Sequence, residues 1–402
     1  MSLHIGSSNI SDIYVGNSKI SDIYVGNDLV YTSNKGPDLT VPLYFEAADP
    51  SVAVTVGFRK GSTENKQDPS GVDFSKYTGY SDPDWSYSYD GLTWSNYSIG
   101  NNITIGGSNP SRVYFKSRTN YTAIPWRGSY TDSSGKVTTT YHIFIQFTAS
   151  GGNVNASGNI QSLLYSDFMA YDSALADCFL YMFQGCTSLI EAPELPATTL
   201  ASFCYWNMFN SCTSLTSAPS LPATTMATDC YNGMFNSCTS LTSAPALPAT
   251  TLAEGCYAYM FQGCTSLTSA PSLPATTMAT YCYNSMFDGC TSLIEAPELP
   301  ATTLASFCYW NMFNSCTSLT NAPSLPATTM ATYCYADMFS GIRANSTASA
   351  PCIYPYRIPE SGTGAMDESS HALSGMFANI DDTATFTPTI NTTFYISVPV
   401  MD

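Results

Sequence analysis

Apolar and polar positions follow a fixed period between residues 177 and 340. The repeated phrase reads Cys-Tyr-x-x-Met-Phe-x-x-Cys-Thr-Ser-Leu-x-x-Ala-Pro-x-Leu-Pro-Ala-Thr-Thr-Leu/Met-Ala-x-x. Its first cysteine lies at Cys178 and again at Cys204, a period of 26 residues (204 − 178), and it recurs up to Cys334. A unit of this size cannot bury its own apolar face, so the units are predicted to stack into a solenoid.

Each unit is predicted to hold one short strand and one short helix. Prolines keep a segment such as Leu215–Leu221 extended, and a Thr that follows can cap the next helix. We expect that helix around Cys230–Asn236, with its apolar side chains turned to the core. This pairing is the geometry of leucine-rich repeats, so residues 159–340 are predicted to form a mixed α/β array whose lead-in, 159–177, caps the N-terminal end.

A shorter repeat opens the chain, where Ile10–Asn17 returns as Ile20–Asn27. Its alternating apolar residues predict strands, and its Gly-Asn pairs predict tight hairpin turns. The predicted three-stranded β-meander, within residues 1–35, has too little core to stand alone. We expect it to attach to a partner or to copies of itself, with packing on the next domain as the alternative. The residues predicted to make the attachment are Ile13, Tyr14, Ile23 and Tyr24.

Residues 36–158 are predicted to form a β-sandwich domain. Turns rich in Gly, Asn, Ser and Pro separate its apolar segments, and helical periodicity is absent. The segment Tyr87–Trp94 predicts a hairpin that turns at Asp90-Gly91, whose aromatic residues are either cross-strand pairs or a platform for carbohydrate. We expect packing, because the hairpin already explains them. The candidate strands are Leu39–Ala47, Val52–Arg59, Asp84–Tyr89, Asn102–Ile105, Arg112–Ser117 and Thr138–Thr148.

The period breaks after Ser340. Prolines and a glycine interrupt the next thirty or so residues, and Ala372–Ala378 then echoes the Met-Phe phrase. Residues 341–402 are therefore predicted to form a C-terminal cap, which a stack of units needs if its last unit is not to present an open end.

The distribution of charge narrows the classes of partner. The chain has 402 residues and a formal net charge of −17, and all thirteen Lys and Arg lie outside the repeats. A surface without cations cannot neutralise phosphates, so we expect no nucleic-acid binding. No run of about 18 apolar residues is present, which predicts no membrane insertion. The first residues lack the basic and apolar regions of a secretory signal, so export by the usual route is not expected.

The sequence offers little chemistry for catalysis or cofactor binding. The two cysteines of a unit are eight residues apart (186 − 178), which on a helix is about 12 Å and too far for a disulfide, so buried thiols are expected. The three histidines lie in different regions, and no Cys-x-x-Cys is present to suggest zinc. Glu191 and Glu194, like Glu295 and Glu298, should point to opposite sides of an extended segment. We therefore expect no enzyme, no metal and no cofactor.

The framework of the repeat hardly changes from unit to unit, but residues that flank Cys-Tyr do. They include Tyr, Trp, Asn, Ser and Gly, which are typical of adaptable binding surfaces. The alternative is an exposed helix face that is free to drift. Residues 190–216 recur unchanged at 294–320, which indicates that the array changes length by duplication of blocks. The predicted binding residues are Phe203, Trp206, Asn207, Asp229, Asn232, Tyr259, Tyr281, Asn284, Phe307, Trp310, Asn311 and Tyr333.

Two stretches resemble known families. The phrase Met-Phe-x-x-Cys-Thr-Ser-Leu-x-x-Ala-Pro-x-Leu-Pro resembles the BspA-like leucine-rich repeats of bacterial surface proteins and of phages that infect gut bacteria. The N-terminal Ile-x-x-Ile-Tyr-Val-Gly-Asn units resemble those that open many bacteriophage tail and receptor-binding proteins. The first resemblance implies binding to surfaces or other proteins, and it carries over no catalytic residues.

Together the resemblances imply a bacteriophage virion structural protein, such as a tail or head fibre or another receptor-binding component. The N-terminal strands would bind other virion proteins, or form a homo-oligomer. The array would bind a host cell-surface protein or glycan, or a neighbouring virion protein. The expected localisation is therefore the virion. The rival expectation is a bacterial cell-surface adhesin of the BspA-like family, against which the missing signal sequence argues.

Overall fold

The computed structural model describes residues 14–15, 18–19, 22–25, 28–32, 39–62, 77–78, 82–121, 127–131, 137–166, 173–319, 323–327, 330–342, 353–357, 372, 376 and 393–397. Most regular elements of this part of the chain are strands, and neither of its two larger sheets closes into a barrel. The only helix among these residues is a 3-10 turn, η3 (Ile160–Leu163). The expectation of a mixed α/β chain is therefore wrong in its helical part.

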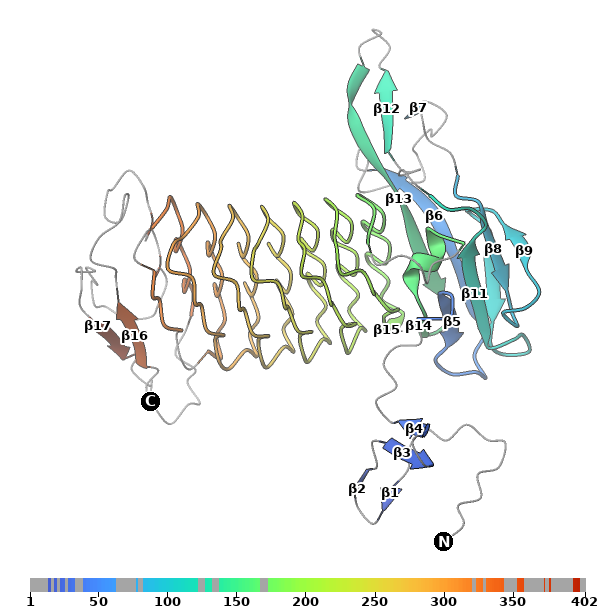
Figure 1. The fold of residues 1–402 in the computed structure, drawn as a ribbon, viewed down its shortest axis with the longest axis horizontal. Coiled ribbons are helices and arrows are strands. Elements are labelled where there is room, and N and C mark those ends of the chain that lie inside the picture. Colours follow the sequence, from blue (N-terminus) through green and yellow to red (C-terminus); the bar gives the residue numbers. More distant parts are fainter. Residues whose placement is uncertain are drawn as a thin grey trace.

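Two sheets pack face to face and form the predicted sandwich (Figure 1). Between them, Phe45 of one sheet stacks on Phe147 of the other with ring centroids 4.0 Å apart. In the order of pairing, the first sheet consists of β15 (Leu189–Glu191), β14 (Val154–Ser157), β5 (Tyr44–Ala47), β11 (Arg112–Ser117), β8 (Trp85–Ser88) and β9 (Ser95–Tyr97). The second consists of β10 (Asn102–Ile105), β6 (Val54–Ser62), β13 (Val137–Ser150), β12 (Arg127–Thr131) and β7 (Tyr77–Thr78).

The predicted strands all have counterparts, and two of them match β10 and β11 at both ends. The predicted hairpin is also present, with β8 paired to β9 so that Trp85 lies opposite Tyr97. Trp85 is 1% exposed and donates its Nε1–H to the carbonyl oxygen of Leu163 in η3 at 2.9 Å. The ring of Trp94 lies 4.0 Å from the Nζ of Lys116. Packing therefore accounts for the aromatic residue at the base of the hairpin.

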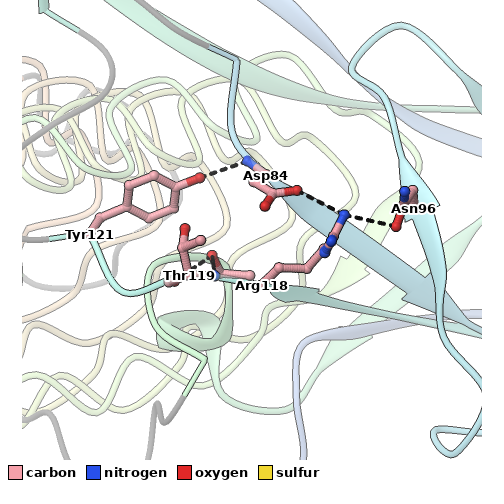
Figure 2. Close-up of polar contacts among 6 residues, drawn as sticks. Asp84, Asn96, Arg118, Thr119 and Tyr121 are labelled. Atoms are coloured by element: carbon pink, nitrogen blue, oxygen red, sulfur yellow. Dashed lines mark hydrogen bonds and ion pairs between the residues drawn. The ribbon is translucent and has the colours of Figure 1, made fainter.

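A small polar cluster fixes the strand ends of this sheet (Figure 2). Arg118 donates to the side-chain oxygen of Asn96 at 2.9 Å and pairs with the Asp84 carboxylate at 3.3 Å. The backbone N–H of Asp84 donates to the hydroxyl of Tyr121 at 2.7 Å. Tyr121 in turn donates its backbone N–H to Leu164, directly after η3. The cluster thus joins three strands to the segment that leads into the repeats. This structural role accounts for the charged side chains of Arg118 and Asp84.

The repeated part of the chain winds in coils that lie side by side (Figure 1). Each unit hydrogen-bonds to the next in register: the Tyr205 N–H donates to the Cys230 carbonyl at 3.0 Å, and Tyr231, Tyr257, Tyr283 and Tyr309 repeat this bond. The tyrosines form a column with centroids 5.6–5.9 Å apart and ring planes within 10°. The phenylalanines from Phe183 to Phe339 form a second column. The core is therefore built from identical residues in contact.

The sandwich and the repeats share one hydrophobic core. Strand β14 pairs in parallel with β15, which belongs to the first unit, and Val154 lies opposite Leu189. On the other sheet, the Phe147 N–H donates to the Met182 carbonyl at 2.6 Å. A single cluster of buried side chains runs from the sandwich into the last described unit, across the predicted boundary at residues 158 and 159. The first unit is thus covered by both sheets.

At the other end, a late segment continues the stack. The Tyr335 N–H donates to Ala372 at 2.9 Å and the Phe339 N–H to Met376 at 3.0 Å, as earlier units bond to each other. Ala372 therefore takes the position of a repeat cysteine, although 38 residues separate it from Cys334 (372 − 334). Most of the predicted cap, residues 341–402, lies outside the described residues. Two further strands, β16 (Ile353–Arg357) and β17 (Thr393–Ser397), pair antiparallel.

The N-terminal strands form two hairpins instead of one meander. Strand β1 (Tyr14–Val15) pairs with β2 (Ser18–Lys19), and β3 (Asp22–Val25) pairs with β4 (Asp28–Thr32). The predicted meander is therefore wrong, because the short polar strand β2 folds back on β1 and leaves β3 to pair with β4.

Candidate binding surface

One edge of every coil is a run of linked turns, which we call the turn edge. It extends from the residue before the first cysteine to the second cysteine, for example Phe203–Cys212. Alternate N–H groups donate to the next unit, as from Phe203 to Thr228 at 3.0 Å. The intervening ones donate three residues back within the unit, as from Trp206 to Phe203 at 3.2 Å. Half of the backbone bonds thus join units and half close turns.

The turn edge requires left-handed backbone at every fourth residue. In the unit at 203–212 these residues are Phe203, Asn207 and Ser211, with φ of 61°, 51° and 61°. Each is the third residue of a turn closed by a bond from the fourth N–H to the first carbonyl, where type II turns need positive φ. The helix predicted for this stretch is therefore wrong: the spacing of four resembles a helical period but marks successive turns.

The structure places all twelve predicted binding residues on the turn edge, Asn284 buried at 3% exposure and the others half-buried. Those with left-handed backbone are Phe203, Asn207, Asp229, Tyr259, Tyr281, Phe307, Asn311 and Tyr333. Trp206, Asn232, Asn284 and Trp310 lie between left-handed positions. The alternative of an exposed face that is free to drift therefore concerns linked turns and not a helix.

Aromatic residues at left-handed positions are costly. A bulky side chain there is a conformational outlier that costs about 1 kcal/mol or more, and such outliers cluster at functional sites. Other units show the cheaper solution at the equivalent positions, with Gly233 at φ 61° and Gly255 at φ 60°. The five predicted residues that combine an aromatic ring with left-handed backbone, Phe203, Tyr259, Tyr281, Phe307 and Tyr333, are therefore the strongest candidates for a selected role.

Polar side chains occupy the middle of the turn edge. The Asp229 carboxylate accepts from the Asn232 side chain at 2.7 Å, and burial raises the pKa of this carboxyl group. It also fills the space beside Gly255, where an added Cβ would lie 2.2 Å from its Oδ1. The Asn284 amide donates to the Tyr259 hydroxyl at 3.1 Å. The predicted residues therefore support one another across neighbouring units.

The aromatic residues gather at two places. In the first, Trp206 lies 5.5 Å from Phe203 and 5.4 Å from Tyr181, and Tyr181 lies 5.0 Å from Phe144 of β13. In the second, Phe307 stacks between Tyr281 at 4.6 Å and Tyr333 at 5.0 Å, with Trp310 at 5.5 Å. Trp310 also donates Nε1–H to Asp337 at 3.4 Å. The first group contacts the sandwich through Phe144.

Sequence reasoning missed Tyr181, Phe144 and Asp337. Tyr181 and Asp337 stand at the left-handed position that Asn207 fills in its own unit, so alignment of all units could have found them. Phe144 comes from another sheet and has no counterpart in the repeat. Of the predicted attachment residues, Tyr14 lies in β1 and Ile23 and Tyr24 lie in β3, while Ile13 is outside the described residues.

The cysteines behind the turn edge are buried thiols. The Sγ of Cys212 donates to the Phe183 carbonyl at 3.0 Å, and Cys238, Cys264, Cys290 and Cys316 repeat this contact at 3.0–3.1 Å. Burial raises the pKa of the Cys230 and Cys264 thiols to about 12. A thiol with so high a pKa is a poor nucleophile and metal ligand. These side chains therefore fill the core.

Two further observations bear on the chemistry of the described residues. They contain no group of three or more His, Cys, Asp or Glu side chains placed to hold a metal ion. They also include no helix with the length and apolar character that crossing a bilayer requires. Comparison with protein-family models, curated proteins and solved structures gave no match to this chain.

Proposed function

We propose that this chain is a bacteriophage virion structural protein, a tail or head fibre or another receptor-binding component. In this proposal the repeats form a solenoid of the leucine-rich-repeat class, and their turn edge binds the host surface or a neighbouring virion protein. The role is binding and not catalysis. The N-terminal hairpins attach the chain to the particle.

The observation that carries the binding role is the contrast between the interior and the turn edge of the coils. The interior repeats the same Cys, Tyr, Met and Phe from unit to unit, whereas the turn edge varies and holds aromatic rings on unfavourable backbone. Variation in an otherwise uniform framework supports recognition, because it changes the surface without changing the fold. The resemblance of the N-terminal units to phage tail proteins supports the virion as the location.

The test is the composition of purified particles. Mass spectrometry of phage purified from a lysate should detect the chain, and deletion of residues 1–31 should prevent its incorporation. Detection of the intact chain only as a free cellular protein would contradict the proposal. The alternative, a bacterial cell-surface adhesin of the BspA-like family, predicts instead that surface labelling of intact cells modifies the chain.

A further inference from the structure

Two identical segments of the array have different surroundings. Residues 190–216 and 294–320 share every residue, so Phe203 and Trp206 recur as Phe307 and Trp310, 104 residues later. In the first copy, Trp206 lies against Tyr181, and Tyr181 lies against Phe144 of β13. Tyr181 and Phe144 are each at most 5% exposed. Packing of the repeats on the sandwich therefore accounts for the first tryptophan.

The same explanation fails for the second copy. Ser285 stands where the first copy has Tyr181 (285 − 104), so the ring that joins Trp206 to Phe144 of β13 has no counterpart beside Trp310. Tyr281 replaces Asp177 (281 − 104), and its ring extends a row through Phe307 to Tyr333 with planes 14° and 11° apart. We call Tyr281, Phe307, Trp310 and Tyr333 the aromatic patch. All four are half-buried, so each residue keeps part of its surface accessible to solvent.

The backbone conformation of the patch supports selection for its aromatic rings. Tyr281, Phe307 and Tyr333 occupy consecutive units at one left-handed position, with φ of 53–58°, and Gly255 shows that the position accepts glycine. Stacking offsets part of the strain, and Trp310, which belongs to the duplicated block, adds an indole 5.5 Å from Phe307. Half-exposed Trp and Tyr in one cluster are typical of the centre of a protein–protein interface.

The negative charge of the repeats favours a partner that carries positive charge. From residue 178 to 340 the chain has eight carboxylates, Glu191, Glu194, Asp229, Glu254, Asp288, Glu295, Glu298 and Asp337, and no Lys, Arg or His. Asp337 accepts the hydrogen bond from Trp310, and Asp288 lies three residues beyond Ser285. A cation above an indole and beside a carboxylate is favoured by both groups, whereas an anion is repelled.

We propose that the aromatic patch is the docking site for a protein segment that carries Lys or Arg side chains, with one cation held between Trp310 and Asp337. This inference rests on the proposed binding function and specifies where on the array it resides. The electrostatic part of the attraction weakens with salt, while the aromatic contacts do not.

The test compares the two tryptophans in the full chain. Calorimetric titration uses a short peptide of alternating Arg and Ser, the same peptide with Glu for Arg, and maltohexaose as a neutral glycan. The Arg peptide should bind, Trp310→Ala should weaken it at least about tenfold, and Trp206→Ala should change it less than about twofold. Asp337→Asn, which keeps the shape of the side chain, should weaken binding and reduce its salt dependence.

Absence of binding by the Arg peptide, equal losses in the two tryptophan variants, or preference for the Glu peptide or the glycan would overturn the inference. If Trp310→Ala fails to fold, Trp310→Phe and Asp337→Asn give the same comparison. Particle incorporation and host-cell binding are measured with the same variants. If the unmodified chain is neither incorporated into particles nor able to bind host cells, the proposed function is contradicted. If the chain binds cells and Trp310→Ala leaves that binding unchanged, only the inference about the patch is contradicted.

Discussion

The sandwich and the repeats bury aromatic residues in opposite ways. In the sandwich, the ring plane of Phe58 makes angles of 70°, 85° and 66° with those of Trp85, Phe115 and Phe147. Each of these neighbours comes from a different strand. In the repeats, each phenylalanine lies nearly parallel to its own copies, with planes 2–11° apart. The sandwich also uses ion pairs such as Arg112–Glu46, while the repeats from 178 to 340 have no cation.

This difference shows what each kind of core can tolerate. A sandwich residue has one set of neighbours, so its substitution affects one site. A repeat residue is part of a column, so units can be added or lost provided that the register is kept. Variation in the repeats lies on the turn edge and at exposed positions such as Glu191 and Ser217, outside the column.

Alkaline pH should unfold the repeats first. Burial raises the pKa of the Cys230, Cys264 and Cys282 thiols to about 12, whereas in an unfolded chain a thiol titrates near 8.5. A raised folded pKa gives stability that is complete below the unfolded pKa and is lost as pH rises toward the folded value. Each thiol then removes up to about 1.4 kcal/mol per pH unit, and thirteen are buried in the repeats.

We therefore expect cooperative loss of the repeats between about pH 9 and 11, measured by near-ultraviolet circular dichroism with a thiol reagent in parallel. Residues 39–158 contain no cysteine, so the thiol reagent does not report on the sandwich. Thiols that react one at a time near their ordinary pKa, with the fold intact, would show that they are not buried in a cooperative core.

Two glycines of the turn edge separate strain from crowding. Gly289 has φ 73° and an added Cβ would meet nothing closer than 3.7 Å, so Gly289→Ala should cost about 1 kcal/mol through backbone strain alone. Gly255→Ala should cost about 2 kcal/mol, because its Cβ would also displace the Asp229 carboxylate from Asn232. Urea unfolding of both variants measures the difference. Equal costs would mean that Asp229 moves away freely.

Removal of an ion pair from the sandwich should have the smallest effect. Arg112 donates to both oxygens of Glu46 at 3.2 and 3.0 Å, but about a third of each side chain is exposed. Glu46→Gln should therefore lower the unfolding free energy by less than about 1 kcal/mol, and less still in high salt. Arg112 also lies 4.4 Å from the centre of the Tyr44 ring, and a loss that salt does not reduce would indicate that the pair acts through this packing.

The sequence alone located the core of the repeats but not the path of the backbone. The period predicts which Cys, Tyr, Met and Phe are buried, because identical residues must meet when units stack. It does not distinguish a helix from linked turns, since Cys204, Met208 and Cys212 follow a spacing of four in either case. Gly233, at the position of Asn207 in the next unit, was the signal for left-handed backbone, visible only when the units are compared.

The predicted binding residues share one edge of the coils, but the sequence pattern does not give the contacts that distinguish them. The varied positions do mark the turn edge, but sequence could not distinguish Trp206 from Trp310, which have identical flanks. Their difference depends on Phe144, a residue more than thirty positions before the first unit, and on Tyr181, which a serine replaces in the later copy. Contacts between the sandwich and the repeats are long-range, so local pattern carries no information about them.

The most direct test of the proposed solenoid is removal of four units without a new junction. Joining Phe203 to Cys308 deletes residues 204–307 and leaves a sequence found in the natural chain. Small-angle scattering should show a folded protein shorter by about 20 Å, because neighbouring strands and coils lie about 5 Å apart. An unfolded or aggregated product, or a folded one of unchanged length, would contradict a stack of interchangeable 26-residue units.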